Sequence, residues 1–263
     1  SGVEAAARAG MKAVALTTQA ILGTEAAICE TCENWCHVRL PDLYRGWVEA
    51  SKIRRYAAGE APYASRGEVA EVESLWAFVY LNPRVSTHPP VLTAPVGTRL
   101  GIEAGEEDGL RVTVPDGASR WIQKGDVSVQ PAGTPRLRGS SQDVVRLARR
   151  FLGLPYLWGG TTPLGIDCSG LVQLVYHLNG IDLLRDASMQ YGQPDLEPVA
   201  RQDLAVGDLV FFGRNRITHV GLHVGSGQFL HATDHLRPVV QISSLGEPHW
   251  IELYQGARRS PGC

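Results

Sequence analysis

Residues 165–180 read GIDCSGLVQLVYHLNG, which predicts an amphipathic helix that begins near Asp167 and ends at Gly180. Its buried face is expected to consist of Leu171, Val172, Val175 and Leu178. Cys168 then lies in the first turn, where unpaired backbone N–H groups and the helix dipole favour an anion. This position predicts a thiol with a pKa lowered toward the thiolate, the form that attacks carbonyl carbons. The backbone N–H of Cys168 is placed to stabilise an oxyanion.

Two downstream histidines, His219 and His231, are candidates for the base that a cysteine nucleophile needs. The strands expected in this half are residues 208–212, 219–224 and 228–232. If Gly225-Ser226-Gly227 forms a three-residue hairpin loop, Gly221 lies opposite His231. His231 then shares a face with His219, one diagonal step away, and one imidazole can orient the other. A two-residue loop would break this register.

Each of these residues also has a plainer interpretation. A lone cysteine is more often a small buried hydrophobe than a nucleophile. The helix start and the paired histidines together favour catalysis by Cys168. Histidines also bind zinc, but the set of Cys168, His219 and His231 lacks a carboxylate or a further cysteine at metal spacing. The sequence therefore predicts no metal and no cofactor.

The first half of the chain contains a repeat with a constant offset of 74 residues and no gap. Its matched pairs include Gly23-Thr24 with Gly97-Thr98, Pro41-Asp42 with Pro115-Asp116, and Trp47-Val48 with Trp121-Ile122. Both copies alternate apolar and polar residues, which indicates short strands and predicts two small β-barrels. The expected domains are 1–60 and 61–130 for the barrels, 131–139 for a linker, and 140–263 for an α+β domain. Ser141 is expected to cap the first helix of that domain.

Composition excludes several classes of protein. The chain has 263 residues, of which 44% are hydrophobic, so disorder is not its main state. A formal net charge of -2 argues against a nucleic-acid partner. No run approaches the roughly 18 apolar residues of a membrane span. Residues 11–23 make a poor signal peptide, which slightly favours the cytoplasm over export, and the oligomeric state is not determined.

Five cysteines cannot all pair with one another. Cys29, Cys32 and Cys36 follow a C-x2-C-x3-C spacing that suggests a metal, although three ligands are one short of a closed zinc site. Cys36 aligns with Leu110 of the second copy, a core-type position, whereas the other two align with glutamates. This alignment favours packing or free thiols, with a hairpin disulfide or a metal as alternatives.

The second half of the chain resembles the NlpC/P60 cysteine peptidases. The segments that carry the resemblance, in the family's order, are PYLWGG at 155–160, DCSG at 167–170, GDLVFF at 207–212, THVG at 218–221 and LHA at 230–232. The repeated barrels resemble bacterial SH3 (SH3b) domains. The resemblance implies two SH3-like β-barrels followed by a papain-like α+β domain. It also implies Cys168 as nucleophile, His219 as base and His231 as the orienting third residue.

The same resemblance implies residues that bind the substrate. In members with this architecture, a tyrosine of the first SH3b domain and an acidic residue after the catalytic helix hold the substrate's free N-terminal amine. These positions fall on Tyr44 and Asp186; a glutamate that some members add is Thr17 here. Tyr44 aligns with Ala118 of the second copy, so the barrel fold does not require a tyrosine at this position. The plainer interpretation of Tyr44 is an ordinary surface tyrosine. The plainer interpretation of Asp186 is a residue that caps the following helix. The further candidates for substrate contact are Tyr156, Trp158, Asp167, Ser169, Arg185 and Ser188.

Members of this type cleave the bond between the γ-carboxyl of D-Glu and a diamino acid in murein peptides. A buried ammonium ion needs a carboxylate and hydrogen bonds, which Asp186 and Tyr44 would supply. The expected substrate is therefore a turnover peptide with a free N-terminal L-Ala. Two alternatives stay open. One is an amidase or endopeptidase that acts on intact peptidoglycan with the SH3b domains as wall anchors. The other is a wall-binding module without catalysis.

Overall fold

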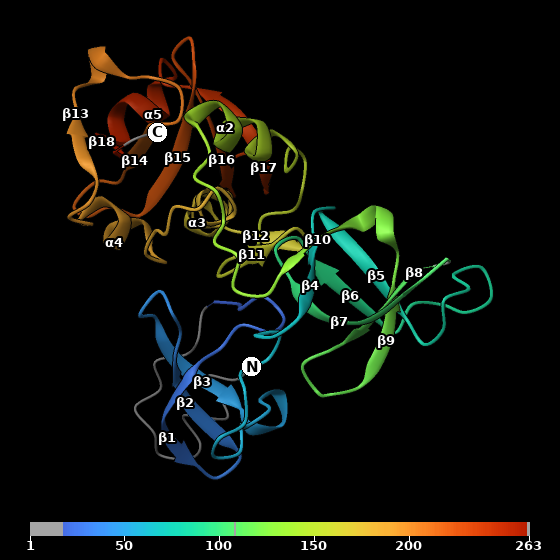
Figure 1. Ribbon diagram of the computed structural model, residues 1–263. Coiled ribbons are helices and arrows are strands. Elements are labelled where there is room, and N and C mark those ends of the chain that lie inside the picture. The colour runs from blue at the N-terminus through green and yellow to red at the C-terminus, as the bar shows by residue number, and fades with distance from the viewer. Residues whose placement is uncertain (1–17, 108, 262–263) are drawn as a thin grey trace. The chain divides into compact units, whose positions relative to one another are not determined.

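The computed structural model describes residues 18–107 and 109–261 (Figure 1). The chain divides into two compact units, Ser1–Pro135 and Arg136–Cys263, and each is described by itself. The boundary falls inside the segment expected as a linker. Within the described ranges, no helix is both long and apolar enough to cross a membrane.

The first unit contains two antiparallel sheets. The three-stranded sheet consists of β1 (Ala27–Cys32), β2 (Trp35–Arg39) and β3 (Arg45–Glu49) in that order. The strands of the seven-stranded sheet, in the order β10-β4-β7-β8-β9-β5-β6, are β4 (Glu68–Val72), β5 (Trp76–Tyr80), β6 (Leu92–Pro95), β7 (Arg99–Glu106), β8 (Gly109–Thr113), β9 (Ser119–Ile122) and β10 (Val127–Pro131). Its core includes Val79, Leu100, Val112 and Ile122, all at most 1% exposed. Aliphatic side chains that alternate along these strands build this core.

The 74-residue repeat is visible in the backbone of both sheets. Strands β1, β2 and β3 correspond to β7, β8 and β9, and the register shift inside β1 recurs at the equivalent place inside β7. The turn before β3 is closed by the N–H of Tyr44, which donates to Asp42 Oδ1 at 3.0 Å. The turn before β9 is closed by the N–H of Ala118, which donates to Asp116 Oδ1 at 2.8 Å. The two copies therefore share one strand–turn–strand design.

The cysteines of the first unit follow the pattern that the repeat predicts. Cys36 has no exposed surface, and it lies at the position equivalent to the buried Leu110. Cys29 is exposed and Cys32 is partly exposed. The four cysteines in the described ranges are Cys29, Cys32, Cys36 and Cys168, all of them free thiols. In the same ranges, no group of three or more potential metal ligands comes together.

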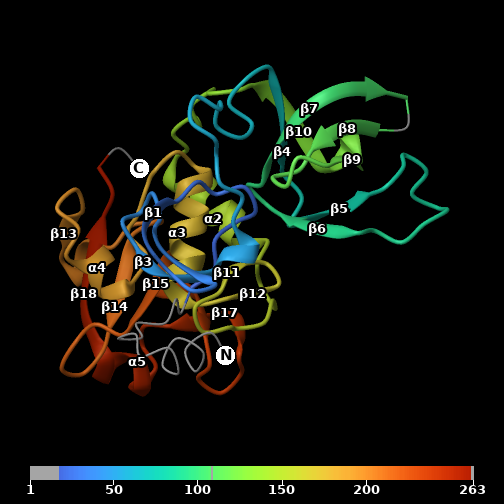
Figure 2. The same cartoon turned by 90° about the horizontal axis from the view of Figure 1, so that it is seen from below.

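The second unit is a six-stranded antiparallel sheet with helices. The sheet order β13-β18-β14-β15-β16-β17 combines β13 (Glu197–Val199), β14 (Leu209–Phe212), β15 (His219–Gly225), β16 (Gln228–Thr233), β17 (Val239–Ser244) and β18 (Tyr254–Arg259). The helices are α2 (Ser141–Arg149), α3 (Cys168–Leu178), α4 (Ala187–Tyr191) and α5 (Pro248–Leu253), and a short pair of strands, β11 (Thr161–Thr162) and β12 (Gly165–Ile166), precedes α3. Helix α3 lies beside α2 and packs on β15 and β16 (Figures 1 and 2).

Two expectations for this unit need correction. The N-cap of α2 is Ser140, not Ser141: its hydroxyl accepts from the N–H of Asp143, whose carboxylate accepts from the N–H of Ser140. Ser141 packs on Gly207 instead, where an added Cβ would lie 2.6 Å from the serine Cβ. The expected order, helices first and a sheet after them, is also incomplete. Helix α5 follows five of the six strands in the chain, and the last strand, β18, lies between β13 and β14 in the sheet.

Candidate active site

Cys168 begins α3 at the junction with the sheet and is 8% exposed. Asp167 is the N-cap residue of the helix: its backbone is extended, and its Oδ1 accepts from the N–H of Gly170 at 2.7 Å. Backbone N–H groups of Ser169 and Val220 act on the Cys168 sulfur, and Val220 follows His219 in β15. The prediction that Cys168 lies in the first turn of a helix is therefore confirmed.

The expected lowering of the thiol pKa is wrong for the free site. Burial raises the pKa of Cys168 to about 12, and the negative charge of Asp167 acts in the same direction. The backbone N–H groups and the guanidinium of Arg185 lower it, but they do not offset the loss of water. Burial therefore favours the neutral thiol over the thiolate in the free site.

The two candidate histidines are hydrogen-bonded to each other. His219 Nε2 lies 2.7 Å from His231 Nδ1, and His231 Nε2 lies 3.0 Å from Ser243 Oγ. The three residues come from the neighbouring strands β15, β16 and β17. If His219 accepts a proton at Nδ1, its Nε2–H donates to His231, whose Nε2–H donates to Ser243. In this arrangement Nδ1 of His219 is the nitrogen that can accept the proton of the thiol.

The hairpin that brings the histidines together differs in detail from the expected one. Residues 226–227 form a two-residue turn with positive φ angles, 51° and 67°, rather than a three-residue loop. A one-residue bulge at Val224 compensates, because an extra residue in the strand shifts the register as an extra loop residue would. Outside the bulge, Gly221 lies opposite His231, and a Cβ added to it would lie 3.2 Å from the histidine Cβ.

Trp250 of α5 packs against both imidazoles. It is 2% exposed and stacks on His219, with ring centroids 5.3 Å apart and planes at 23°. It meets the His231 ring edge-on at 4.9 Å. Burial lowers the pKa of His219 to about 3 and that of His231 well below its ordinary value. Both rings are therefore neutral near pH 7 in the free site.

Three of the expected substrate contacts form one buried cluster next to the nucleophile. Arg185, 2% exposed, donates to both carboxylate oxygens of Asp167 at 2.7 and 3.0 Å, and to Ser169 Oγ at 2.9 Å. The carboxylate also accepts from the N–H of Gly159 at 2.9 Å. These bonds fix the start of α3 against the loop that precedes it, so they position Cys168.

The other expected substrate contacts of the second unit do not belong to this cluster. Tyr156 is half-buried, and burial together with the charges of Cys168 and Asp167 raises its pKa, which puts the phenol near the nucleophile. Trp158 is 75% exposed. Asp186 occupies the N-cap position of α4 without a side-chain cap hydrogen bond, and Ser188 is exposed in that helix.

The first unit contributes one candidate that the structure describes. Tyr44 is half-buried in the turn that leads into β3. Thr17, the position of the glutamate that some family members carry, lies outside the described residues.

Sequence reasoning missed two residues of the site, Ser243 and Trp250. Ser243 reaches His231 only because β17 pairs with β16 in one register, in which His231 lies opposite Gln241. Trp250 depends on how α5 packs on the sheet. Neither residue belongs to a motif; a tryptophan soon after the histidine strands is the one signal that could have drawn attention to α5.

Comparisons with known proteins agree with this geometry. Residues 153–259 match the NlpC/P60 family, and residues 8–53 match the bacterial dipeptidyl-peptidase Sh3 domain. A γ-D-glutamyl-L-lysine dipeptidyl-peptidase of Bacillus cereus is 31% identical over 93% of this chain and 75% of its own length. The Bacillus subtilis protein of the same name is 28% identical over 82% and 72%.

A crystal structure of an NlpC/P60 family protein from Bacillus cereus superposes with a TM-score of 0.80 at 29% identity. The superposition covers 92% of this chain and 81% of the other. The likeness extends over an SH3-like N-terminal domain as well as the domain that holds Cys168 and the two histidines. The chain therefore belongs to the NlpC/P60 family of cysteine peptidases.

Proposed function

We propose that this protein is an endopeptidase that cleaves the bond between the γ-carboxyl of D-Glu and a diamino acid in murein peptides. The observation that carries the proposal is the thiol of Cys168 at the start of α3, beside a strand whose His219 is hydrogen-bonded to His231. The names of the relatives that cover both units supply the substrate class.

The proposed reaction uses the proton arrangement of the free site. Cys168 gives its proton to Nδ1 of His219 as the sulfur attacks the γ-carbonyl carbon of D-Glu. The tetrahedral oxyanion is stabilised by the backbone N–H of Cys168. His219 then gives the proton to the leaving amine, and the C–N bond breaks to leave a thioester. Water, deprotonated by His219, hydrolyses the thioester and restores the thiol. His231 keeps the His219 ring oriented throughout.

Tyr44 and Asp186 are proposed to bind the substrate's free N-terminal ammonium. A buried ammonium ion requires a carboxylate and hydrogen-bond acceptors, which these side chains provide. Peptides that begin with L-Ala would be accepted, whereas intact peptidoglycan, in which this amine is an amide, would be rejected. Tyr156 and Trp158 are proposed to line the groove before the nucleophile.

The proposed architecture has three domains: residues 1–60, 61–130 and 140–263, with a linker at 131–139. The first is supported by the Sh3 match, and the second by the strands and turns that it shares with the first copy. We take both as SH3b domains.

The decisive experiment compares L-Ala-γ-D-Glu-diaminopimelate with a free and with an acetylated N-terminus, and identifies the products by mass. The enzyme is expected to release L-Ala-γ-D-Glu from the free peptide at least 10-fold faster, since the acetyl group removes the buried charge pair. Cys168→Ala should release nothing.

Three other outcomes would each support a different assignment. Equal turnover of both peptides would argue against the amine site and for an enzyme that acts on intact wall. Product formation by Cys168→Ala would remove the catalytic assignment. A wild-type enzyme that yields no product from either peptide would favour a wall-binding module.

A further inference from the structure

Two further histidines, His235 and His249, stack face to face in the second unit. Their ring centroids lie 3.8 Å apart, and their planes are 6° from parallel. His235 lies in the loop that follows β16, the strand of His231, and His249 is the second residue of α5. The stacked rings therefore connect α5 to the loop next to a catalytic strand. The proposed reaction gives neither ring a role.

Trp250 connects this stack to the catalytic rings. Its indole meets His249 and His235 edge-on, with ring centroids 4.6 and 5.6 Å away. The same indole stacks on His219 at 5.3 Å and meets His231 edge-on at 4.9 Å. Four imidazoles thus surround one tryptophan. A movement of α5 that displaces the tryptophan therefore acts directly on the ring of the proposed base.

The stacked histidines are also within electrostatic range of the catalytic pair. A positive charge on His249 lowers the pKa of His219, and one on His235 lowers the pKa of His231. Burial and the neighbouring His235 lower the pKa of His249 itself. Two imidazolium ions at this separation repel each other, so the stack is most stable while at least one of its rings is neutral.

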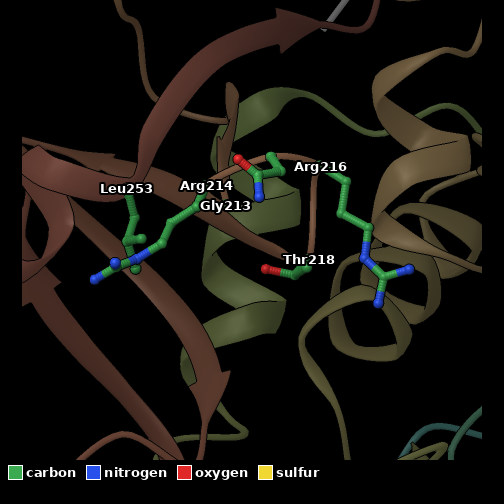
Figure 3. Close-up of a pocket in the computed structure, with 6 residues that line it drawn as sticks. Gly213, Arg214, Arg216, Thr218 and Leu253 are labelled. Atoms are coloured by element: carbon green, nitrogen blue, oxygen red, sulfur yellow. The ribbon is translucent and has the colours of Figure 1, made fainter.

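Charged groups from two elements face His249. Glu252 of α5 and Glu247 before it raise the pKa of His249, whereas Arg214 of the β14–β15 loop lowers it. Arg214 pairs with Glu252 at 2.8 Å, and Leu253 of α5 lines the same pocket as Arg214 (Figure 3). Histidine is the side chain that ordinarily changes its charge between pH 5 and 8. Among these groups, the stacked rings are therefore the ones that respond to pH in that range.

The loop that carries His235 is held by its own backbone. The N–H of His235 donates to Thr233 Oγ1 at 3.1 Å, and the N–H of Arg237 donates to the carbonyl of His235 at 2.8 Å. Asp234 and Arg237, the charged residues of opposite sign that flank the histidine, are both exposed. The loop thus presents the His235 ring to α5 from a defined backbone conformation.

We propose that His235 and His249 are positioning residues, whose stack holds α5 so that Trp250 keeps the His219 ring in place for proton transfer. This inference rests on the proposed function, in which His219 is the base. As the pH falls below about 6, both stacked rings take up protons and repel each other, and α5 no longer holds the tryptophan. The kcat/KM of the enzyme then falls. His219 does not itself cause this loss, since burial lowers its pKa to about 3.

The test measures kcat and KM on L-Ala-γ-D-Glu-diaminopimelate between about pH 5 and 8. His249→Ala removes one ring of the stack and is expected to lower kcat at neutral pH about fivefold, the scale of one aromatic pair, with KM unchanged. Ile251→Ala changes a half-exposed side chain of the same helix. It is the matched control and should follow wild type at every pH.

His249→Phe separates the stack from its charge, because phenylalanine can stack on His235 but cannot be protonated. This variant is expected to restore kcat at neutral pH to within about twofold of wild type. At the acid end of the range it should keep roughly fivefold more of its neutral-pH kcat/KM than wild type does, because the repulsion between two charges is gone. His235→Phe, the reciprocal exchange, should behave in the same way.

The outcomes separate this inference from the proposed function. Full kcat in His249→Ala overturns the inference, and so does a loss confined to KM, which would make the histidine a substrate contact. A His249→Phe enzyme as impaired as His249→Ala, or one whose acid profile coincides with that of wild type, also overturns it. In each of these cases the proposed function stands. Failure of the wild type to cleave the peptide at any pH overturns both.

Discussion

Ser243 is the end of the hydrogen-bond chain that starts at His219, and it is the only group in that chain whose proton can rotate freely. When its hydroxyl accepts from Nε2 of His231, Nδ1 of His231 accepts from His219. The serine thereby holds the His231 ring, which in turn orients His219. It is a positioning residue, since it acts on the reaction through two rings.

Ser243→Ala is expected to lower kcat about 10-fold without changing KM, because His231 loses the hydrogen bond that holds its ring while the substrate groove is untouched. Steady-state kinetics on L-Ala-γ-D-Glu-diaminopimelate measure this split. Ser244→Ala, the next residue of β17, serves as the control and should keep the wild-type kcat. A Ser243→Ala enzyme with full kcat would show that His231 does not need this partner.

Arg185 and Asp167 form a buried ion pair, so their contributions to the free energy of unfolding are expected to be coupled. Arg185→Met leaves the carboxylate buried and uncompensated, and should lower the free energy of unfolding by roughly 3–5 kcal/mol. Asp167→Asn combined with Arg185→Met should cost less than the sum of the two single changes. Urea unfolding of the four proteins gives the coupling free energy. Additivity within about 0.5 kcal/mol would mean that the pair does not act as a unit.

The neutral histidines predict that the second unit loses stability in acid. His219 has its pKa lowered from 6.5 to about 3, so below pH 6.5 the unfolded chain binds a proton that the folded chain does not. Its contribution is fully present above pH 6.5 and is lost as the pH falls toward 3, at up to about 1.4 kcal/mol per pH unit. The thiol of Cys168 behaves in the opposite way: its contribution is lost as the pH rises from 9 toward 12.

Urea unfolding at successive pH values tests this. His219→Gln should flatten the acid side of the profile, and His88→Gln, an exposed histidine of the first unit, should leave it unchanged. An acid profile equally steep in His219→Gln would assign the loss of stability to other groups.

At the scale of elements, the hairpin of β15 and β16 places both histidines, and Gly221 is its tightest point. A Cβ at this position would lie 2.5 Å from Phe229 Cδ2 and 3.2 Å from the Cβ of His231. Gly221→Ala is therefore expected to lower the free energy of unfolding by about 1–3 kcal/mol and to reduce kcat by displacing His231. In the double variant Gly221→Ala/Phe229→Leu, the smaller side chain at position 229 makes room for the added Cβ. This variant should recover part of the lost free energy of unfolding and part of the lost kcat. Gly125→Ala, where nothing lies within 4 Å of the added Cβ, is the control.

Elements that depend on local pattern were predictable, and those that depend on distant packing were not. Helix α3 and the strands around His219 and His231 follow from apolar periodicity and turn residues in the sequence. The sequence YQGARR of β18 has no apolar alternation, so only its pairing with β13 and β14 identifies it as a strand. The thiol pKa was predicted in the wrong direction for the same reason: the helix start is local, whereas the burial of Cys168 comes from the whole second unit.

At the scale of the whole molecule, the repeat shows which features of the first copy are architectural. The turn that holds Tyr44 is closed by its backbone N–H and Asp42, and the second copy closes the same turn with Ala118 and Asp116. The fold of the turn therefore needs the aspartate and not the tyrosine. The turn therefore does not account for the tyrosine, which is consistent with the recognition role proposed for Tyr44.

Tyr44→Ala in the full chain gives the first copy the residue that the second copy carries, so the turn is expected to form as before. With Tyr44 proposed as a partner of the substrate amine, KM for the peptide with a free N-terminus should rise about 10-fold, the scale of one hydrogen bond to a charged group, while slow turnover of the acetylated peptide stays unchanged. Ala118→Tyr, the reverse exchange in the second copy, should leave both values at wild type. An unchanged preference for the free amine in Tyr44→Ala would exclude the tyrosine from the amine site and leave Asp186 as its remaining proposed residue.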